Sequence, residues 1–119
     1  MAEHNELGKI GEQLAIDYLL KNGYKIRERN YRYLKAEVDI IALKENTLVA
    51  VEVKTRTSNY FGNPEDFVTK KKIKLLVSAI DFYVTKKKLD VNVRFDIIAI
   101  TLEKSTHKLE HLEDAFLYF

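Results

Sequence analysis

The stretch EVDIIALKENTLVAVEVKTR, residues 37–56, decides the fold. It contains two apolar segments on either side of a short polar turn, the pattern of a β-hairpin that is buried on both faces. Each segment nevertheless carries charges at the end far from the turn, Glu37 and Asp39 on the first and Glu52 and Lys54 on the second. Ionised side chains in such strands are costly unless they are paired or bind an ion. This cluster is therefore the first candidate for a functional site.

The turn determines which of these charges meet. A turn centred on residues 45–46 places opposite each other, across an antiparallel hairpin, residues whose numbers sum to 91. Asp39 then faces Glu52, and Glu37 faces Lys54. Because side chains two residues apart share one face of a strand, all four are predicted to project from one side of the sheet at one end.

Two carboxylates directly opposite each other destabilise a hairpin unless a cation lies between them. Asp39 and Glu52, with backbone carbonyls nearby, suit a hard, oxygen-seeking ion such as Mg²⁺ or Mn²⁺ that keeps positions open for a substrate phosphate. Lys54 beside such an ion would orient an attacking water or stabilise charge on the phosphate. The alternative is a structural network in which Lys54 pairs with Glu37 and Glu52 at a partly hydrated end of the sheet.

The composition of the chain predicts one globular domain over residues 1–119. The chain has 119 residues, 46% of them hydrophobic, which is enough to bury a core. It contains no cysteine, which excludes disulfides, thiol nucleophiles and metal sites built on cysteine. The N-terminal sequence lacks the pattern of a signal peptide, and no apolar stretch reaches the roughly 20 residues that span a bilayer. We therefore expect a soluble, cytoplasmic protein.

Hydrophobic periodicity predicts the order α-β-β-β-α-β, an α/β fold with a central mixed sheet flanked by helices. The predicted strands are residues 24–33, 38–43, 48–53 and 91–100, and a helix with its apolar stripe between residues 73 and 84 precedes the last of them. The first strand is expected near an edge of the sheet. The pattern leaves open the type of a final element, residues 111–119, whose aromatic side chains are expected to pack on the core.

The first predicted helix carries an apolar stripe of Leu7, Ile10, Leu14 and Tyr18. Two glycines in its first half, at positions 8 and 11, are each unfavourable in a helix by about 1 kcal/mol relative to Ala. They are expected to allow the close approach of a strand or a ligand.

Basic residues gather in two stretches, although the net charge is only +2. Residues 21–35 carry six Lys or Arg against one Glu, with three tyrosines interleaved, and residues 68–88 carry seven Lys against one Asp. A polyanion is the natural ligand of such stretches, because each Lys or Arg that neutralises a phosphate releases condensed counterions. The alternative for either stretch is a solvated surface.

The order of elements and the spacing Asp-x12-Glu-x-Lys of Asp39, Glu52 and Lys54 resemble the PD-(D/E)XK nuclease superfamily, which includes restriction enzymes and archaeal Holliday-junction resolvases. A more specific resemblance, to the YraN-like bacterial family of candidate endonucleases, covers nearly the whole chain. It is carried by GKIGEQLAIDYLLKNGYKIRERNYR, AEVDIIA, VAVEVKTRTSNYFGNPEDFVTKKK, RFDIIAI and DAF. One departure is the turn before Glu37, which is usually Gly-Gly in that family and is Lys-Ala here.

The resemblance implies a restriction-endonuclease-like αβββαβ core and a metal-dependent endonuclease that hydrolyses DNA phosphodiester bonds, with branched or junction DNA as one substrate class. Asp39 and Glu52 would bind Mg²⁺ or Mn²⁺ with the Val53 carbonyl assisting, Lys54 would be the catalytic lysine, and Glu12 would join the metal site through water. The residues assigned to DNA by the resemblance and by the basic stretches are Arg29, Arg32, Lys35, Arg56, Lys70, Lys71, Lys72 and Lys74.

A fold does not guarantee an activity. The alternative is therefore a catalytically inactive module with a nuclease-like fold that binds nucleic acid or a partner protein. Steep salt dependence would indicate phosphate contacts rather than a neutral protein interface. Symmetric cutting of two strands would favour a homodimer. His4, His107 and His111 are predicted to lie on the surface and outside the site.

Overall fold

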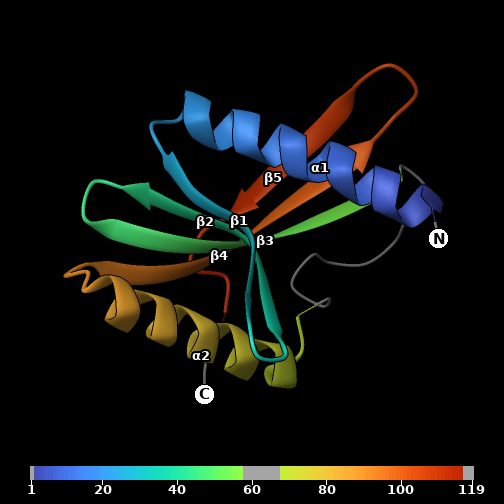
Figure 1. Cartoon of the computed structure of the whole chain (residues 1–119). Helices are drawn as coiled ribbons and strands as arrows, with labels where there is room; N and C mark the ends of the chain where they lie inside the picture. Colours follow the sequence, from blue (N-terminus) through green and yellow to red (C-terminus); the bar gives the residue numbers. More distant parts are fainter. Residues whose placement is uncertain (1, 58–67, 117–119) are drawn as a thin grey trace.

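The structure, a computed structural model, describes residues 2–57 and 68–116, with side chains from residue 6 onward (Figure 1). The elements, in chain order, are α1 (Ala2–Lys21), β1 (Lys25–Tyr33), β2 (Ala36–Lys44), β3 (Thr47–Thr57), α2 (Lys70–Lys87), β4 (Asn92–Leu102) and β5 (His107–Leu112). The predicted αβββαβ order is confirmed, and β5 is an addition that the sequence pattern left open. The segment 58–67, part of the family resemblance, lies outside the described residues.

The five strands form one mixed sheet in the order β1-β2-β3-β4-β5, so β1 is at an edge as predicted. Neighbouring strands are antiparallel except β3 and β4, which run parallel and are joined through α2. The two helices lie on opposite faces of the sheet (Figure 1). The predicted class, a central mixed sheet flanked by helices, is confirmed.

Each helix covers its own hydrophobic cluster. On the α1 side, Ala15, Ile16 and Leu19 pack with Val49 and other buried residues of the sheet. The predicted stripe of α1 is wrong at Ile10, which is 50% exposed. On the other side, buried residues of α2 pack against β2, β3 and β4, and Phe116 from the C-terminal segment joins them. Its ring stacks on Phe95 at 5.6 Å between centroids, as expected for an aromatic of that segment.

One glycine of α1 sets how closely the helix approaches the sheet. A Cβ atom at Gly11 would overlap Thr55 Oγ1 on β3, so only glycine permits this contact. The predicted close approach of a strand is thus confirmed at Gly11. Gly8 has no neighbour within 4 Å of such a Cβ among the described residues, so a ligand at that position remains a prediction.

The second helix begins with a side-chain cap. The Thr69 side chain accepts a hydrogen bond from the Lys72 N–H at 3.1 Å, which satisfies one of the free amides of the first turn. The helix ends at Lys87 and is capped by Lys88, whose φ of 55° lies in the left-handed region. Within residues 2–57 and 68–116, neither helix is long and apolar enough to cross a membrane.

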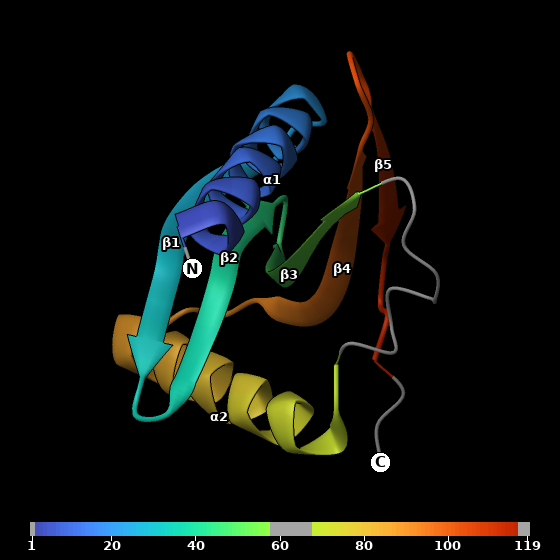
Figure 2. The same ribbon diagram turned by 90° about the vertical axis from the view of Figure 1, so that its right-hand side faces the viewer.

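The central hairpin has the predicted register and then opens. Residues of β2 and β3 pair with numbers that sum to 91, from Lys44 and Thr47 at the turn to Ile40 and Val51. Beyond that pair β3 continues along β4 to Thr57, whereas β2 continues along β1. Figure 2 shows β2 and β3 diverging from each other. We call the point just beyond the last pair the fork.

Candidate functional site

Asp39 and Glu52 are the first residues beyond the last strand pair, so they lie at the fork. The Val53 N–H donates to Asp39 Oδ2 at 2.8 Å, and the Asp39 N–H donates to Glu52 Oε2 at 3.3 Å. The Asp39 carboxylate of β2 thus accepts a hydrogen bond from the backbone of β3, and the Glu52 carboxylate of β3 accepts one from the backbone of β2. Both bonds lie just beyond the last pair of β2 and β3. This reciprocal bonding holds the two acidic side chains together, as the register predicted.

Burial and mutual repulsion disfavour the charged state of this pair. The Glu52 side chain is 5% exposed. Burial and the nearby Glu52 charge raise the pKa of Asp39 from its ordinary 3.8 to about 7, against the opposing effects of the Val53 N–H and Lys72. Burial also raises the pKa of Glu52, although Lys72 acts against it. A proton or a cation therefore stabilises the fork.

Lys72 of α2 supplies part of that positive charge. Its Nζ lies 2.9 Å from Glu52 Oε1. Burial alone would lower the pKa of Lys72, but the charge and hydrogen bond of Glu52 outweigh it and raise the pKa. The sequence placed Lys72 among the DNA contacts, and this ion pair is a partnership that it did not predict.

Asp39 lines two cavities, one beside α1 and one beside α2. A cavity of about 190 Å³ is lined by Glu12, Asp39, Val53 and Lys54, with Leu7, Gly8 and Thr55 completing it. Three of the four residues proposed for catalysis thus line one cavity together with Val53, and the fourth, Glu52, is buried. Burial raises the pKa of Glu12, opposed by a hydrogen bond from the Asn30 side chain and by the charge of Arg29.

The other cavity, of about 320 Å³, lies between β2 and the start of α2. Its lining includes Lys35, Glu37, Asp39, Lys71 and Lys72, with Ala36, Thr69, Leu75 and Leu76. Three of the predicted DNA-binding lysines are therefore brought to the edge of the carboxylate site. We call this the basic cavity.

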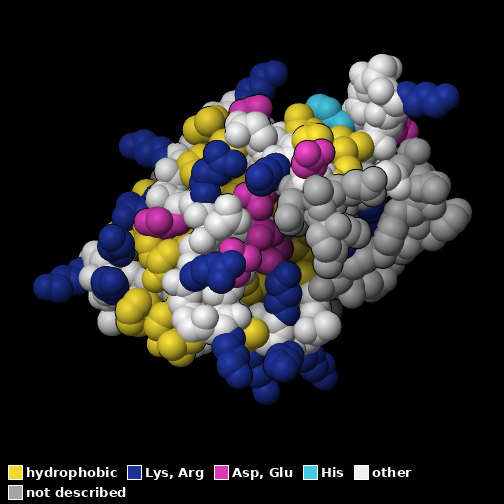
Figure 3. All heavy atoms as spheres, turned by 45° about the vertical axis from the view of Figure 1, so that its right-hand side comes forward, with side chains coloured by type: hydrophobic (Ala, Val, Ile, Leu, Met, Phe, Trp, Pro, Cys, Tyr) yellow, Lys and Arg dark blue, Asp and Glu magenta, His cyan; other side chains and the backbone are white. Residues whose placement is uncertain are grey.

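The remaining predicted DNA contacts line neither cavity. Figure 3 shows acidic side chains gathered in a hollow with Lys and Arg around it. Arg29, Arg32, Lys70 and Lys74 are exposed. The Arg56 Nε donates to Thr101 Oγ1 at 3.4 Å, which holds that side chain against β4.

The predicted pairing of Glu37 is wrong. Glu37 lies opposite Arg32 of β1, and their side chains form an ion pair of 3.3 Å. The predicted pairing of Glu37 with Lys54 fails because β2 and β3 have already separated at that level.

The donor set fits a metal ion that keeps part of its water shell. Among the described residues there is no group of three or more His, Cys, Asp or Glu side chains arranged to hold a metal. A closed protein cage is thereby excluded in that part of the chain. Mg²⁺, however, is usually bound by one or two carboxylates with water and substrate phosphate completing the shell, and Asp39 and Glu52 match that requirement.

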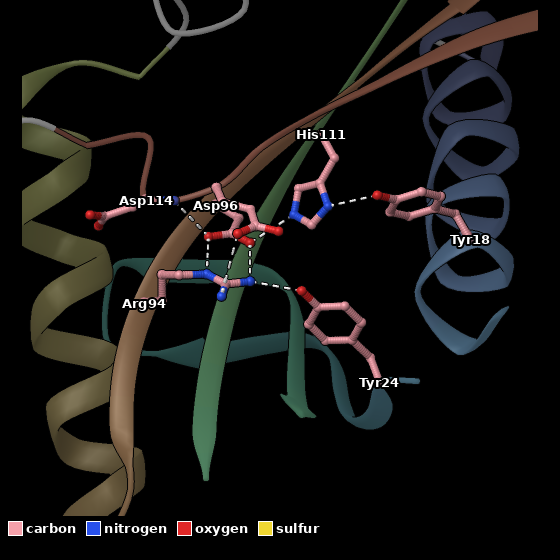
Figure 4. A network of polar contacts seen from close by, with 7 residues as sticks. Tyr18, Tyr24, Arg94, Asp96, His111 and Asp114 are labelled. Atoms are coloured by element: carbon pink, nitrogen blue, oxygen red, sulfur yellow. Dashed lines mark hydrogen bonds and ion pairs between the residues drawn. The ribbon is translucent and has the colours of Figure 1, made fainter. Parts of the chain in front are cut away.

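A second buried carboxylate has the opposite environment (Figure 4). Asp96 on β4 is fully buried and forms two bonds of 2.9 Å with Arg94, one of 2.7 Å with His111 Nε2 and one of 3.0 Å with the Asp114 N–H. Burial alone would raise the pKa of Asp96, but the bonds from His111 and Arg94 hold it below its usual range. Tyr18 and Tyr24 complete what we call the Asp96 network.

The Asp96 network corrects the prediction for His111. Its side chain is only 7% exposed, and its Nδ1 lies 2.9 Å from the Tyr18 hydroxyl of α1. His107 is exposed, as predicted, and the side chain of His4 lies outside the described residues. The signal for this network was available: an acidic residue in the apolar run of β4, the same feature that singled out Asp39.

Comparison with known proteins identifies the family. A model of the uncharacterised protein family UPF0102 matches residues 11–100. The chain belongs to this family. Membership of the YraN-like family, predicted from the sequence, is thereby confirmed.

The relatives match all or nearly all of the chain. It is 61% identical over 119 residues to a UPF0102 protein of Christiangramia forsetii, with 100% of both chains covered. It is 57% identical over 119 residues to UPF0102 protein FP2501 of Flavobacterium psychrophilum, again over 100% of both chains. A UPF0102 protein of Bacteroides thetaiotaomicron is 51% identical over 116 residues, which is 98% of this chain and 96% of the relative. None of these names states a reaction.

Proposed function

We propose that this UPF0102 protein is a metal-dependent endonuclease of the PD-(D/E)XK type that hydrolyses phosphodiester bonds in DNA. The observation that carries the proposal is the fork, where Asp39 and Glu52 are held together in a partly buried site that disfavours their joint ionisation. Lys54 and Glu12 line the same cavity as Asp39. Lys35, Lys71 and Lys72 line the basic cavity on Asp39, and such positive charge suits a polyanionic substrate.

The residues of the chain would divide the work as follows. Asp39 and Glu52 would hold Mg²⁺ or Mn²⁺, with Val53 near enough through its backbone to assist. The ion would supply a water of lowered pKa and neutralise charge on the phosphate. Lys54 would orient the attacking water, and Glu12 would accept hydrogen bonds from water at the mouth of the cavity.

The test is cleavage of labelled duplex, single-stranded, flap and four-way-junction DNA with Mg²⁺, Mn²⁺ or EDTA. The wild type should cut only with metal. The variants Asp39→Asn, Glu52→Gln and Lys54→Ala should each lose on the order of 10³-fold in rate, the size typical for a group that acts on the transition state. Asp39→Asn keeps an oxygen that accepts from the Val53 N–H, so it tests charge rather than folding.

The matched control is Asp81→Asn, which changes an exposed carboxylate of α2 in the same way. It should cut like the wild type. Metal-dependent cutting at the wild-type rate by both Asp39→Asn and Glu52→Gln would overturn the assignment. No cutting by the wild type, together with salt-sensitive retention of one DNA structure, would establish the DNA-binding module instead.

A further inference from the structure

The hairpin of β1 and β2 extends past the fork as a two-stranded arm. The strands remain paired as far as Tyr33 and Ala36, well beyond the level at which β3 leaves β2. Figure 2 shows this arm reaching down to α2. Tyr33 stacks on Phe82 at 4.3 Å and Tyr31 packs edge-on against Tyr83 at 5.1 Å between ring centroids. The arm is thus braced on the helix.

The tip of the arm holds an unusual residue. Leu34 is the first of two turn residues between the paired Tyr33 and Ala36, and its φ of 55° lies in the left-handed region. Gly, Asn and Asp are the residues that adopt this conformation at least cost. Leu34 is also 86% exposed. A single exposed leucine is ordinary. Leu34, however, combines this exposure with a left-handed backbone conformation that is unfavourable for leucine.

The surroundings of Leu34 indicate which ligand it meets. The next residue, Lys35, lines the basic cavity together with Lys71, Lys72 and Asp39. A phosphate backbone that passes through this cavity toward the fork therefore brings its bases past the tip of the arm. Leu34 is five residues from Asp39, so the two are at most about 17 Å apart along an extended chain. At about 3.4 Å per nucleotide of a stacked strand, this spans about five nucleotides.

We propose that Leu34 is a wedge that packs against an unstacked base of the DNA, within about five nucleotides of the phosphate at Asp39 and Glu52. Apolar side chains, leucine among them, enter opened base steps in this way. The cost of unstacking is least where stacking is already interrupted, so the preferred substrate has a flap, nick or branch at that position. The inference rests on the proposed function in taking DNA as the ligand.

The test measures the base directly and does not require cutting. Flap and intact-duplex DNA carrying 2-aminopurine at successive positions are titrated with protein in EDTA. Wild-type protein should raise the fluorescence at one position next to the flap. The variant Leu34→Asn, which suits the left-handed conformation, should lose this rise and bind flap DNA about tenfold more weakly. Its binding to intact duplex should be unchanged, and Leu34→Phe should retain both the rise and the preference.

The matched control is Leu20→Asn, because Leu20 is also an exposed leucine, 54% exposed, on α1. It should behave like the wild type. A fluorescence rise that persists in Leu34→Asn would overturn the wedge, as would a wild type that binds neither DNA. If Leu34→Asn hydrolyses DNA with the wild-type ratio of flap to duplex rates, the wedge is contradicted and the nuclease proposal stands. A fluorescence response without hydrolysis in Mg²⁺ would remove the nuclease and leave the wedge.

Discussion

The two buried carboxylate sites of this protein, at Asp96 and at Asp39, differ in how the charge of the carboxylate is balanced. Asp96 is surrounded by donors from β4, β5 and the following turn, and these hold its pKa below the usual range. Asp39 accepts a hydrogen bond from the Val53 N–H, but burial and the charge of a second carboxylate, Glu52, act on it more strongly, so its pKa rises to about 7. Within the part of the chain that the structure describes, donors and positive charge stabilise the ionised form of Asp96, whereas burial and Glu52 disfavour the ionised form of Asp39.

We take this difference to distinguish a structural site from the proposed functional one. A fully paired buried charge stabilises the fold only while all its partners are present. An incompletely compensated pair costs stability when ionised, and perturbed groups of this kind cluster where a protein binds or transforms a ligand. The difference also predicts opposite responses to mutation and pH.

The largest expected effect is the loss of stability in Asp96→Asn. Removing one partner of a buried, hydrogen-bonded ion pair leaves Arg94 with only the exposed carboxylate of Glu113, 3.7 Å away, and should cost about 3 kcal/mol. Because the pKa of Asp96 is lowered, this contribution is present above the ordinary pKa and is lost as pH falls. Urea unfolding at pH 8 measures this cost, and urea unfolding below the ordinary pKa of 3.8, at about pH 2, measures its loss. Asp81→Asn is the control, and an equal loss in the two variants would contradict the assignment.

The same substitution at the fork should have the opposite sign. The raised pKa of Asp39 means that its protonated form is favoured in the folded state, so stability falls as pH rises from about 4 through 7. Asp39→Asn removes this loss and should be more stable than the wild type at pH 8, on the order of 2 kcal/mol. The gain should vanish near pH 4. Urea unfolding of the wild type and the variant between pH 4 and pH 8 tests this expected gain. If the variant is less stable than the wild type at pH 8, positive charge in the wild type already balances the two carboxylates.

Metal ions should stabilise one site and not the other. Free Mg²⁺ at tenfold its Kd should stabilise the wild type by about 1.4 kcal/mol, because it binds the folded state alone. Asp39→Asn should lose this response, whereas Asp96→Asn should keep it from a lower starting point. Thermal unfolding with and without Mg²⁺ at constant ionic strength provides the measurement. A response that survives Asp39→Asn would place the ion elsewhere.

The smallest effect is expected from the lysine that partly compensates the fork. Lys72→Met removes the 2.9 Å ion pair with Glu52 and should cost about 1 kcal/mol at pH 8, since the lysine itself is half exposed. The cost should shrink at low pH, where Glu52 takes up a proton. Lys74→Met, an exposed lysine of the same helix, is the control. Equal costs at both pH values would indicate that only packing was lost.

Much of the fold is local information and was predictable. The apolar runs and the polar residues between them determined the central hairpin, its register and hence the meeting of Asp39 with Glu52. The edge position of β1 followed from alternation, and the mixed sheet flanked by helices followed from the order of elements. Periodicity failed where burial depended on distant elements, as at the exposed Ile10.

By itself, then, the sequence determined which strands pair and which two carboxylates face each other, because a short turn and a two-residue period act over few residues. Only the tertiary structure decided the surroundings of those carboxylates. The fork, the Lys72–Glu52 ion pair and the packing of Gly11 on Thr55 join residues far apart in the chain. The burial of His111 against Asp96 and Tyr18 likewise required α1, β4 and β5 to be in place. Such contacts depend on how helices pack on the sheet, which no local pattern encodes.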